Sequence, residues 1–259
     1  MSGEGDAKDL CRDWFTRHAA NYATDASQRA GPDLVLLLER LETRPTDRAL
    51  DLGTAAGNTA RALAPRVGEL IGLDLTPAMR ERFEEEARAA GLRNLRFAVG
   101  DADALPFPDG DFDLLSCRRA VHHFPDPAAA LRESFRVLRP GGRAGFADMV
   151  SPANPAAADL FNGIERARDP SHRRALDPET WRRLVEGAGF EVLSFALLPD
   201  RIPWERWLSP VAPGGPEDAA ARALLGAADA ASRAEVSEEG RDGLVFLKTR
   251  VVLTARKPA

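Results

Sequence analysis

The sequence lacks the features that would place it in a specialised class of protein. No apolar run approaches the roughly 18 residues that a membrane-spanning helix needs. The polar and acidic stretch 1–6 shows no signal-peptide pattern. The two cysteines, Cys11 and Cys117, lie in unrelated contexts, so the sequence indicates neither a disulfide framework nor a zinc site. We therefore expect a cytoplasmic protein that does not enter a membrane and binds no metal ion.

An excess of positive charge is also missing. The chain has 35 Lys and Arg residues against 40 Asp and Glu residues, which gives a formal net charge of −5. Acidic residues are mixed among the arginines, so no basic stripe results, and this argues against nucleic acid as a partner. The length of 259 residues and the hydrophobic content of 44% are ordinary for a globular protein. We expect a single domain over 1–259 and leave a homodimer open.

A glycine-rich turn within residues 48–57 is the most informative stretch. It predicts a short buried strand closing at Asp51, a sharp turn, and then a helix. Gly53 and Gly57 suit a backbone that bends tightly and approaches a ligand, although the glycines alone could serve only the corner. Such a turn in an α/β sheet can hold a nucleotide-like ligand. The Lys-Ser or Lys-Thr pair of a phosphate-binding loop is absent, which argues against hydrolysis of a nucleoside triphosphate.

Predicted strands and helices alternate after residue 45. Strands are expected at about 48–52, 69–74, 95–99, 112–117, 143–150, 190–198 and 243–254. Most are separated by helical patterns, including one that Thr76 would cap. Such units predict a parallel sheet with helices on both faces. Two further helices, at about 7–22 and 31–42, precede the sheet and are expected to form an N-terminal helical lid over 1–44.

An acidic residue ends the second predicted strand, and another follows the third. Asp74 lies about twenty residues after Gly53, where a carboxylate can accept hydrogen bonds from both hydroxyls of a ribose. Asp74 could instead cap the following helix, but Thr76 is the better cap. Asp101 and Ala102 follow the third strand, where a carboxylate and a backbone amide can recognise an adenine edge. The carboxyl edge of the sheet therefore suits an adenosine.

Polar residues also end the fourth predicted strand, beside the glycine turn. Cys117 and Arg118 would add polar contacts there for a small charged tail on the adenosine. Arg118 and Arg119 could hold a carboxylate of the cofactor or of an acidic acceptor. The alternative is a solvated surface arginine, which we favour for Arg119.

The order of these motifs resembles class I S-adenosylmethionine-dependent methyltransferases, in particular the small-molecule branch similar to the enzymes of ubiquinone and menaquinone biosynthesis. The matching segments are 50–57, 72–79, 100–110, 112–118, 122–126 and 137–142. The resemblance is tight over 45–150, the expected cofactor-binding half, and loose beyond it. It implies a Rossmann-like, seven-stranded, mostly parallel sheet with helices on both faces, in which the last strand runs antiparallel inside the sheet.

The resemblance also implies where S-adenosyl-L-methionine, and its product S-adenosyl-L-homocysteine, would bind. Gly53, Thr54 and Gly57 would pass close to the methionine part. The backbone around Cys117 and Arg118 would meet the methionine ammonium.

The adenosine end of the cofactor is assigned in the same way. Asp74 would hold the ribose, and Leu75 and Met79 would flank the adenine. Asp101 would take the adenine amino group, and Ala102 would give a backbone contact.

One position departs from the family pattern. Ala55 stands where the family usually has a central glycine, and its methyl group restricts positive φ. It could crowd the cofactor or merely shift the turn. A non-catalytic binding or regulatory subunit therefore remains an alternative.

Histidines supply the candidate bases. His122 and His123 are adjacent, so their side chains would diverge and form a poor metal pair. We predict that His122 faces the substrate and acts as the base, with His172 as a second candidate, because histidine titrates near neutrality. Structural histidines are the alternative for the adjacent pair, and an exposed loop residue for His172. An ionised or amine acceptor would need no base.

The resulting hypothesis is methyl transfer to a small organic acceptor by in-line displacement, in which the protein mainly positions the reactants. The acceptor is expected between the N-terminal helices and two irregular segments, 151–176 and 199–240, which would form a substrate cap. Cyclisation or decarboxylation with the same fold and cofactor is an alternative. A nicotinamide oxidoreductase ranks last. The acceptor, and whether carbon, oxygen or nitrogen is methylated, stay open.

Overall fold

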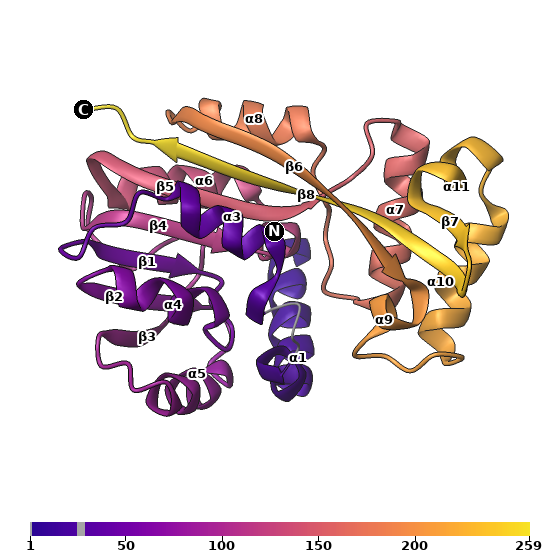
Figure 1. Cartoon of the computed structure of the whole chain (residues 1–259), viewed down its shortest axis with the longest axis horizontal. Helices are drawn as coiled ribbons and strands as arrows, with labels where there is room; N and C mark the ends of the chain where they lie inside the picture. The colour runs from indigo at the N-terminus through magenta and orange to yellow at the C-terminus, as the bar shows by residue number, and fades with distance from the viewer. Residues whose placement is uncertain (1, 25–28) are drawn as a thin grey trace.

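The computed structural model describes residues 2–24 and 29–259 and is built on one twisted, mostly parallel sheet (Figure 1). The strands are β1 Arg48–Leu52, β2 Glu69–Asp74, β3 Leu95–Val99, β4 Phe112–Arg118, β5 Leu138–Val150, β6 Glu191–Pro203, β7 Ser237–Gly240 and β8 Gly243–Arg256. Their order is β3-β2-β1-β4-β5-β8-β6, and β8 runs antiparallel to both β5 and β6. The predicted Rossmann-like architecture, with its last long strand inside the sheet, is confirmed. The short β7, which pairs with β8, adds an eighth strand that the sequence did not reveal.

Helices connect and flank these strands. They are α1 Ser2–Thr24, α3 Pro32–Arg40, α4 Asn58–Leu63, α5 Met79–Ala89, α6 Pro127–Val137, α7 Pro155–Arg168, α8 Pro178–Gly187, α9 Trp204–Leu208, α10 Pro216–Ala227 and α11 Ala230–Val236, with short 3-10 turns η1 Ala64–Arg66 and η2 Val121–His123. A proline at the first helical position begins several of them, where its missing N–H costs nothing. Within the described residues, no helix has the length and apolar character to cross a membrane.

The start of α5 differs from the prediction. The residue before its first turn is Ala78, which gives no side-chain cap, so Thr76 does not cap the helix. The backbone N–H of Thr76 instead donates to the carboxylate of Asp74, 2.9 Å away. The chain therefore makes an additional turn before the helix begins, because Asp74 holds the Thr76 amide.

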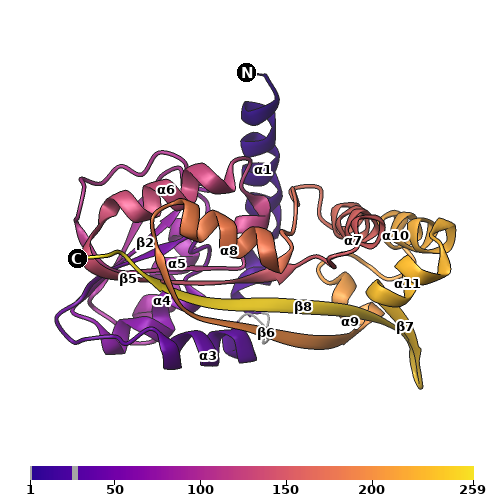
Figure 2. The same cartoon turned by 90° about the horizontal axis from the view of Figure 1, so that it is seen from above.

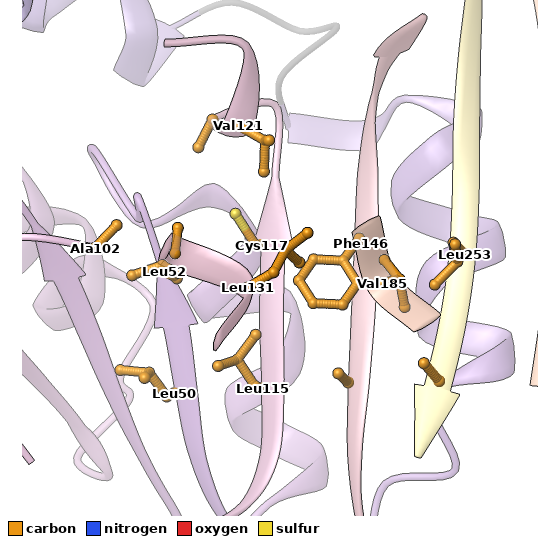
Figure 3. Close-up of a cluster of buried hydrophobic side chains, with 14 of the residues drawn as sticks. Leu50, Leu52, Ala102, Leu115, Cys117, Val121, Leu131, Phe146, Val185 and Leu253 are labelled. Carbon is orange, nitrogen blue, oxygen red and sulfur yellow. The ribbon is translucent and has the colours of Figure 1, made fainter. Parts of the chain in front are cut away.

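Alternating side chains on the strands form a separate apolar core on each face of the sheet. On one face, Leu52, Cys117 and Phe146 pack with Leu131 of α6 and Val185 of α8 (Figure 3). The opposite face packs against α3, α4 and α5, through residues that include Leu37, Leu63, Phe83, Leu114 and Val252. Figure 2 shows α6 and α8 on one side of the sheet and α3 on the other. The sheet is therefore a rigid platform whose carboxyl edge is free to bind a ligand.

A second group of helices lies beyond the edge of this platform. β6 and β8 continue as a long ribbon, and α7, α9, α10 and α11 gather around its far end (Figure 1). We call these four helices the helical extension. They share an apolar core with the strands that includes Phe161, Trp204, Trp207, Leu225 and Phe246. The segments 151–176 and 199–240, predicted as a substrate cap, supply most of this extension.

Candidate cofactor pocket

A pocket lies at the carboxyl ends of β1 to β4 and is lined on one side by α1. Figure 1 shows α1 beside these strand ends. Parallel strands expose their loops together at this edge, which is where open α/β sheets bind ligands. Seven of the residues predicted to bind the cofactor line it: Gly53, Thr54, Asp74, Leu75, Asp101, Ala102 and Arg118. Five predicted site residues do not line it: Gly57, Met79, Cys117, His122 and His172.

The glycine turn is shaped by contacts on both sides. Gly53 has a φ of 65°, and a Cβ there would lie 2.5 Å from Cβ of Ala120. Gly57 has a φ of 81°, and a Cβ would lie 2.6 Å from the ring of Phe83. Both positions therefore require glycine. Gly57 faces the core rather than the pocket, as does Met79, which is fully buried beside Phe83.

The position that departs from the family pattern adopts the conformation that glycine favours. Ala55 has a φ of 46° and lines the pocket. Its N–H donates to Oδ2 of Asp74 over 2.8 Å, while Thr76 N–H donates to Oδ1. Burial raises the pKa of Asp74, and these two amide hydrogen bonds counteract the shift. The turn thus keeps the positive φ that a glycine would adopt at this position. Two backbone amides fix the orientation of the Asp74 carboxylate.

Asp51 supports the turn from below, a role that sequence reasoning missed. This buried carboxyl accepts hydrogen bonds from the hydroxyls of Thr54 and Ser116, each over 2.6 Å. Burial raises its pKa to about 6, and the hydrogen bonds from the two hydroxyls counteract only part of that shift. Its place in the motif, two residues before Gly53, was the signal that could have identified it.

α1 closes the pocket from above. Lys8, Cys11 and Phe15 line it from one face of this helix, at helical spacing. The ammonium of Lys8 lies 2.7 Å from carboxylate oxygens of both Asp101 and Asp103. Asp101, the predicted adenine ligand, is therefore paired across the pocket in this structure. Of the two other aromatic residues in this helix, Trp14 is buried, and the side chain of Tyr22 lies outside the described part of the chain.

α3 belongs to the core rather than to a lid. It packs beside β5 and β8, and its Asp33 carboxylate accepts hydrogen bonds from Nε of Arg118 and Nε of Arg119, both over 2.8 Å. Both guanidinium groups are buried or nearly so, and both arginines line the pocket. The expectation that Arg119 is a solvated surface residue is wrong, because this carboxylate draws its side chain inward.

The pocket-facing histidine is His123, rather than His122 as predicted. The ring of His123 lies edge-on to Phe15, with 5.0 Å between ring centroids. His122 turns away toward β5, where its Nδ1 lies 2.6 Å from Oδ1 of Asp148. The 3-10 turn η2 separates the two side chains in this way. His172 stands behind His122, at a ring-centroid distance of 5.5 Å.

Hydrogen bonds and burial define the state of these rings. Nδ1 of His123 lies 3.1 Å from the carbonyl oxygen of Ser171, and Nε2 of His172 lies 2.8 Å from Oδ1 of Asn162. Burial, followed by the charge of His122, lowers the pKa of His123 to about 4 and that of His172 to about 2. Both are therefore neutral at neutral pH. Within 2–24 and 29–259, no group of three or more His, Cys, Asp or Glu side chains is placed to hold a metal ion.

Comparison with known proteins identifies the family. A family model described as a methyltransferase domain matches residues 50–146. The methyltransferase YcgJ of Bacillus subtilis is 40% identical over 170 residues, covering 66% of this chain and 67% of YcgJ. The chain belongs to the class I S-adenosylmethionine-dependent methyltransferases.

Other relatives agree with this placement of the methyltransferase. The ubiquinone/menaquinone biosynthesis C-methyltransferase UbiE of Roseobacter denitrificans is 34% identical over 180 residues, covering 61% of this chain and 72% of UbiE. A solved methyltransferase structure from Bacillus halodurans superposes with a TM-score of 0.82 at 28% identity, covering 88% of this chain and 100% of that one. The resemblance stated from the sequence motifs is thereby confirmed.

The helical extension stands apart from the pocket of this methyltransferase. None of the described residues after Pro125 lines the pocket. The loop 169–176 nevertheless reaches the wall behind it, where Ser171 contacts His123 and the N–H of Arg173 donates to the carbonyl of His122. The segments predicted as a substrate cap therefore do not line the pocket, and they contact its wall through His122 and His123.

Proposed function

We propose that this methyltransferase binds S-adenosyl-L-methionine in the pocket under α1 and transfers its methyl group to a small organic acceptor. The observation that carries the proposal is the convergence of Gly53, Asp74 and Asp101 on one pocket. The bound sulfonium supplies an electrophilic methyl group. The protein then needs chiefly to bind, align and shield the reactants.

The residues present fit the cofactor. Each oxygen of Asp74 already accepts one backbone amide, which fixes the carboxylate and leaves lone pairs for two ribose hydroxyls. Gly53 keeps the turn open, since any Cβ would strike Ala120. Asp101 and Ala102 lie farther along the same wall, where the adenine would lie. Lys8 would have to share Asp101 with the adenine amino group.

We place the acceptor beside His123 and Phe15, at the end of the pocket nearest β4. The hydrogen bond from Nδ1 to Ser171 leaves Nε2 of neutral His123 as an acceptor for a hydroxyl or amine proton. His122, which is paired with Asp148, packs against the ring of His123 with 4.1 Å between ring centroids, and this contact positions His123. The predicted roles of His122 and His172 thus become supporting ones in this proposal, and His123 becomes the candidate group in contact with substrate.

Calorimetric titration tests the cofactor assignment. S-adenosyl-L-methionine and S-adenosyl-L-homocysteine are expected to bind, and NAD is not. Asp74→Ala should weaken both by at least a hundredfold, because it removes the ribose contact and leaves two amides unpaired.

A matched control is Asp113→Asn, which changes another buried carboxylate at the opposite end of the sheet, in β4. It should leave the affinity unchanged. Equal losses in the two variants would contradict a ribose-binding role for Asp74. A bound acceptor whose product gains no methyl group would instead favour cyclisation or decarboxylation.

A further inference from the structure

Two adjacent arginines in the pocket wall share one carboxylate. Nε of Arg118 and Nε of Arg119 both lie 2.8 Å from Oδ2 of Asp33. Nη2 of Arg119 also lies 2.8 Å from Oδ1. Asp33 is fully buried, so its single negative charge faces two guanidinium groups at short range.

The backbone is distorted to bring these side chains together. Successive side chains on a strand point to opposite faces, so Arg118 and Arg119 would normally diverge. Arg119 instead adopts a φ of 55° just past the end of β4, and its N–H donates to the carbonyl of Ala147 over 2.7 Å. Left-handed conformations are unfavourable for residues with a Cβ and are often found at functional sites. The distortion turns both guanidinium groups toward Asp33.

The position of Arg119 is electrostatically unfavourable for a cation. Burial and the neighbouring charge of Arg118 lower its pKa to about 10, against the opposing effect of Asp33. Arg250 adds repulsion, although its own guanidinium pairs with Asp200 over 2.6 Å. A second anion near Arg119 would relieve this repulsion.

Arg119 also has hydrogen-bonding capacity left. Its Nε and Nη2 are taken by Asp33, and Nη1 has no hydrogen-bond partner among the described residues. The residue lines the pocket. The guanidinium group of Arg119 therefore uses Nε and Nη2 to hold Asp33 and keeps Nη1 available as a donor. Such a donor is suited to a carboxylate.

We propose that Arg119, held in place by Asp33 and flanked by Arg118, is a binding site for a carboxylate group of a molecule in the pocket. The inference rests on the proposed function, because the same pocket would hold the cofactor. Two sources can supply the carboxylate: the methionine tail of the cofactor, or the acceptor.

The test uses adenosine ligands that differ only in the tail. S-adenosyl-L-homocysteine, its decarboxylated analogue and 5′-methylthioadenosine are titrated calorimetrically into the wild type and into Arg119→Gln. If the cofactor supplies the carboxylate, Arg119→Gln weakens S-adenosyl-L-homocysteine by about tenfold or more and leaves the other two unchanged. Binding of 5′-methylthioadenosine tests the adenosine site by itself, so failure of the proposed function is seen separately.

Benzoate serves as the probe for an acceptor carboxylate, with benzamide as its neutral counterpart. Both are titrated into the protein with and without S-adenosyl-L-homocysteine. If the acceptor supplies the carboxylate, benzoate binds the wild type in preference to benzamide, and Arg119→Gln loses that preference while keeping its affinity for S-adenosyl-L-homocysteine.

A second variant separates binding from a merely structural role. Asp33→Asn removes the shared negative charge and should tighten whichever carboxylate probe responds, by about threefold or more. A structural role would weaken binding in both variants. Arg168→Gln is the matched control, since Arg168 also shares a buried carboxylate, Glu165, with another cation, but lies outside the pocket. If Arg119→Gln binds every probe as the wild type does, the proposal is overturned.

Discussion

Two parts of this methyltransferase use the same arrangement of charges in different surroundings. At the pocket, Asp33 lies between Arg118 and Arg119. In the helical extension, Glu165 lies between Lys248 and Arg168, with N–O distances of 2.6 and 3.0 Å. Each cluster is one buried carboxylate bonded to two cations.

The surroundings decide what each cluster does. Glu165 also accepts a hydrogen bond from Nε1 of Trp207, and Arg168 stacks over that ring at 5.4 Å and donates to the carbonyl of Ser209. The two cations of the extension therefore interact with groups of the protein itself. Arg119 instead faces a pocket with Nη1 uncommitted. A charge count does not distinguish a structural cluster from a binding site, whereas access to a cavity does.

The largest expected effect is a loss of stability in the extension. Glu165→Gln should lower the free energy of unfolding by about 3–5 kcal/mol, because it leaves Lys248 buried without its counter-charge. Urea denaturation measures the loss, and affinity for S-adenosyl-L-homocysteine should not change. The double variant Glu165→Gln/Lys248→Met should regain part of the stability.

The corresponding substitution in the pocket cluster is Asp33→Asn, and it tests whether the two clusters differ in their contribution to stability. Asp33→Asn should cost less than Glu165→Gln, because water or a ligand can reach Arg119 from the pocket. Equal costs in the two variants would show that the pocket cluster is as structural as the one in the extension.

The next effect is a pH dependence that distinguishes the two carboxyl groups Asp51 and Glu165. Burial raises the pKa of Asp51 to about 6, and its hydroxyl partners only partly counteract the shift. At Glu165, Lys248 and Arg168 outweigh burial and hold the pKa well below its usual value. Asp51 therefore contributes stability that is fully present below about pH 4 and lost as pH rises through about 6. Glu165 contributes in the opposite sense, and its stability is lost on acidification.

The variant Asp51→Asn isolates this contribution. The unfolding free energy of the wild type, minus that of the variant, should fall by about 2 kcal/mol between pH 4 and pH 7. Denaturation curves at several pH values measure it. A difference that stays constant over this range would mean that Asp51 titrates normally in the folded protein.

The smallest expected effect concerns the strained backbone of the pocket. Ala55→Gly should raise the unfolding free energy by up to about 1 kcal/mol, because glycine adopts a φ of 46° without the Cβ penalty. Cofactor affinity should be kept or improved. The neighbouring Ala56→Gly is the control: Ala56 is buried and has no positive φ, so the same substitution should destabilise there. Equal responses at both positions would exclude strain at Ala55 as the cause.

The sequence predicted the fold and most of the cofactor pocket because these depend on local signals in a fixed order. Strand–turn–helix periodicity indicated the parallel sheet. Gly53 follows β1, Asp74 is the last residue of β2, and Asp101 lies two residues after β3, so all three lie at the carboxyl end of a strand. Parallel strands bring such positions to one edge whatever else the chain does. Motif order likewise indicated the family, which the relatives confirm.

Contacts between segments that are far apart in the sequence could not be predicted from such local patterns. Nothing near Arg119 in sequence indicates that Asp33, 86 positions earlier, will draw it into the wall. The orientation of His122 toward Asp148, and of His123 toward the pocket, depends on one 3-10 turn and on a loop from residues 169–176.

The sequence by itself thus determined the sheet, its carboxyl edge and the glycine and acidic residues placed there, because period-2 and helical patterns fix local geometry and strand direction. Only the tertiary structure decided that both arginines line the pocket, which histidine faces it, that Lys8 spans it, and that the segments predicted as a cap build a separate core. Side-chain direction there is set by burial and charge pairing between segments far apart in the chain, and such pairing leaves no periodic signal in the sequence.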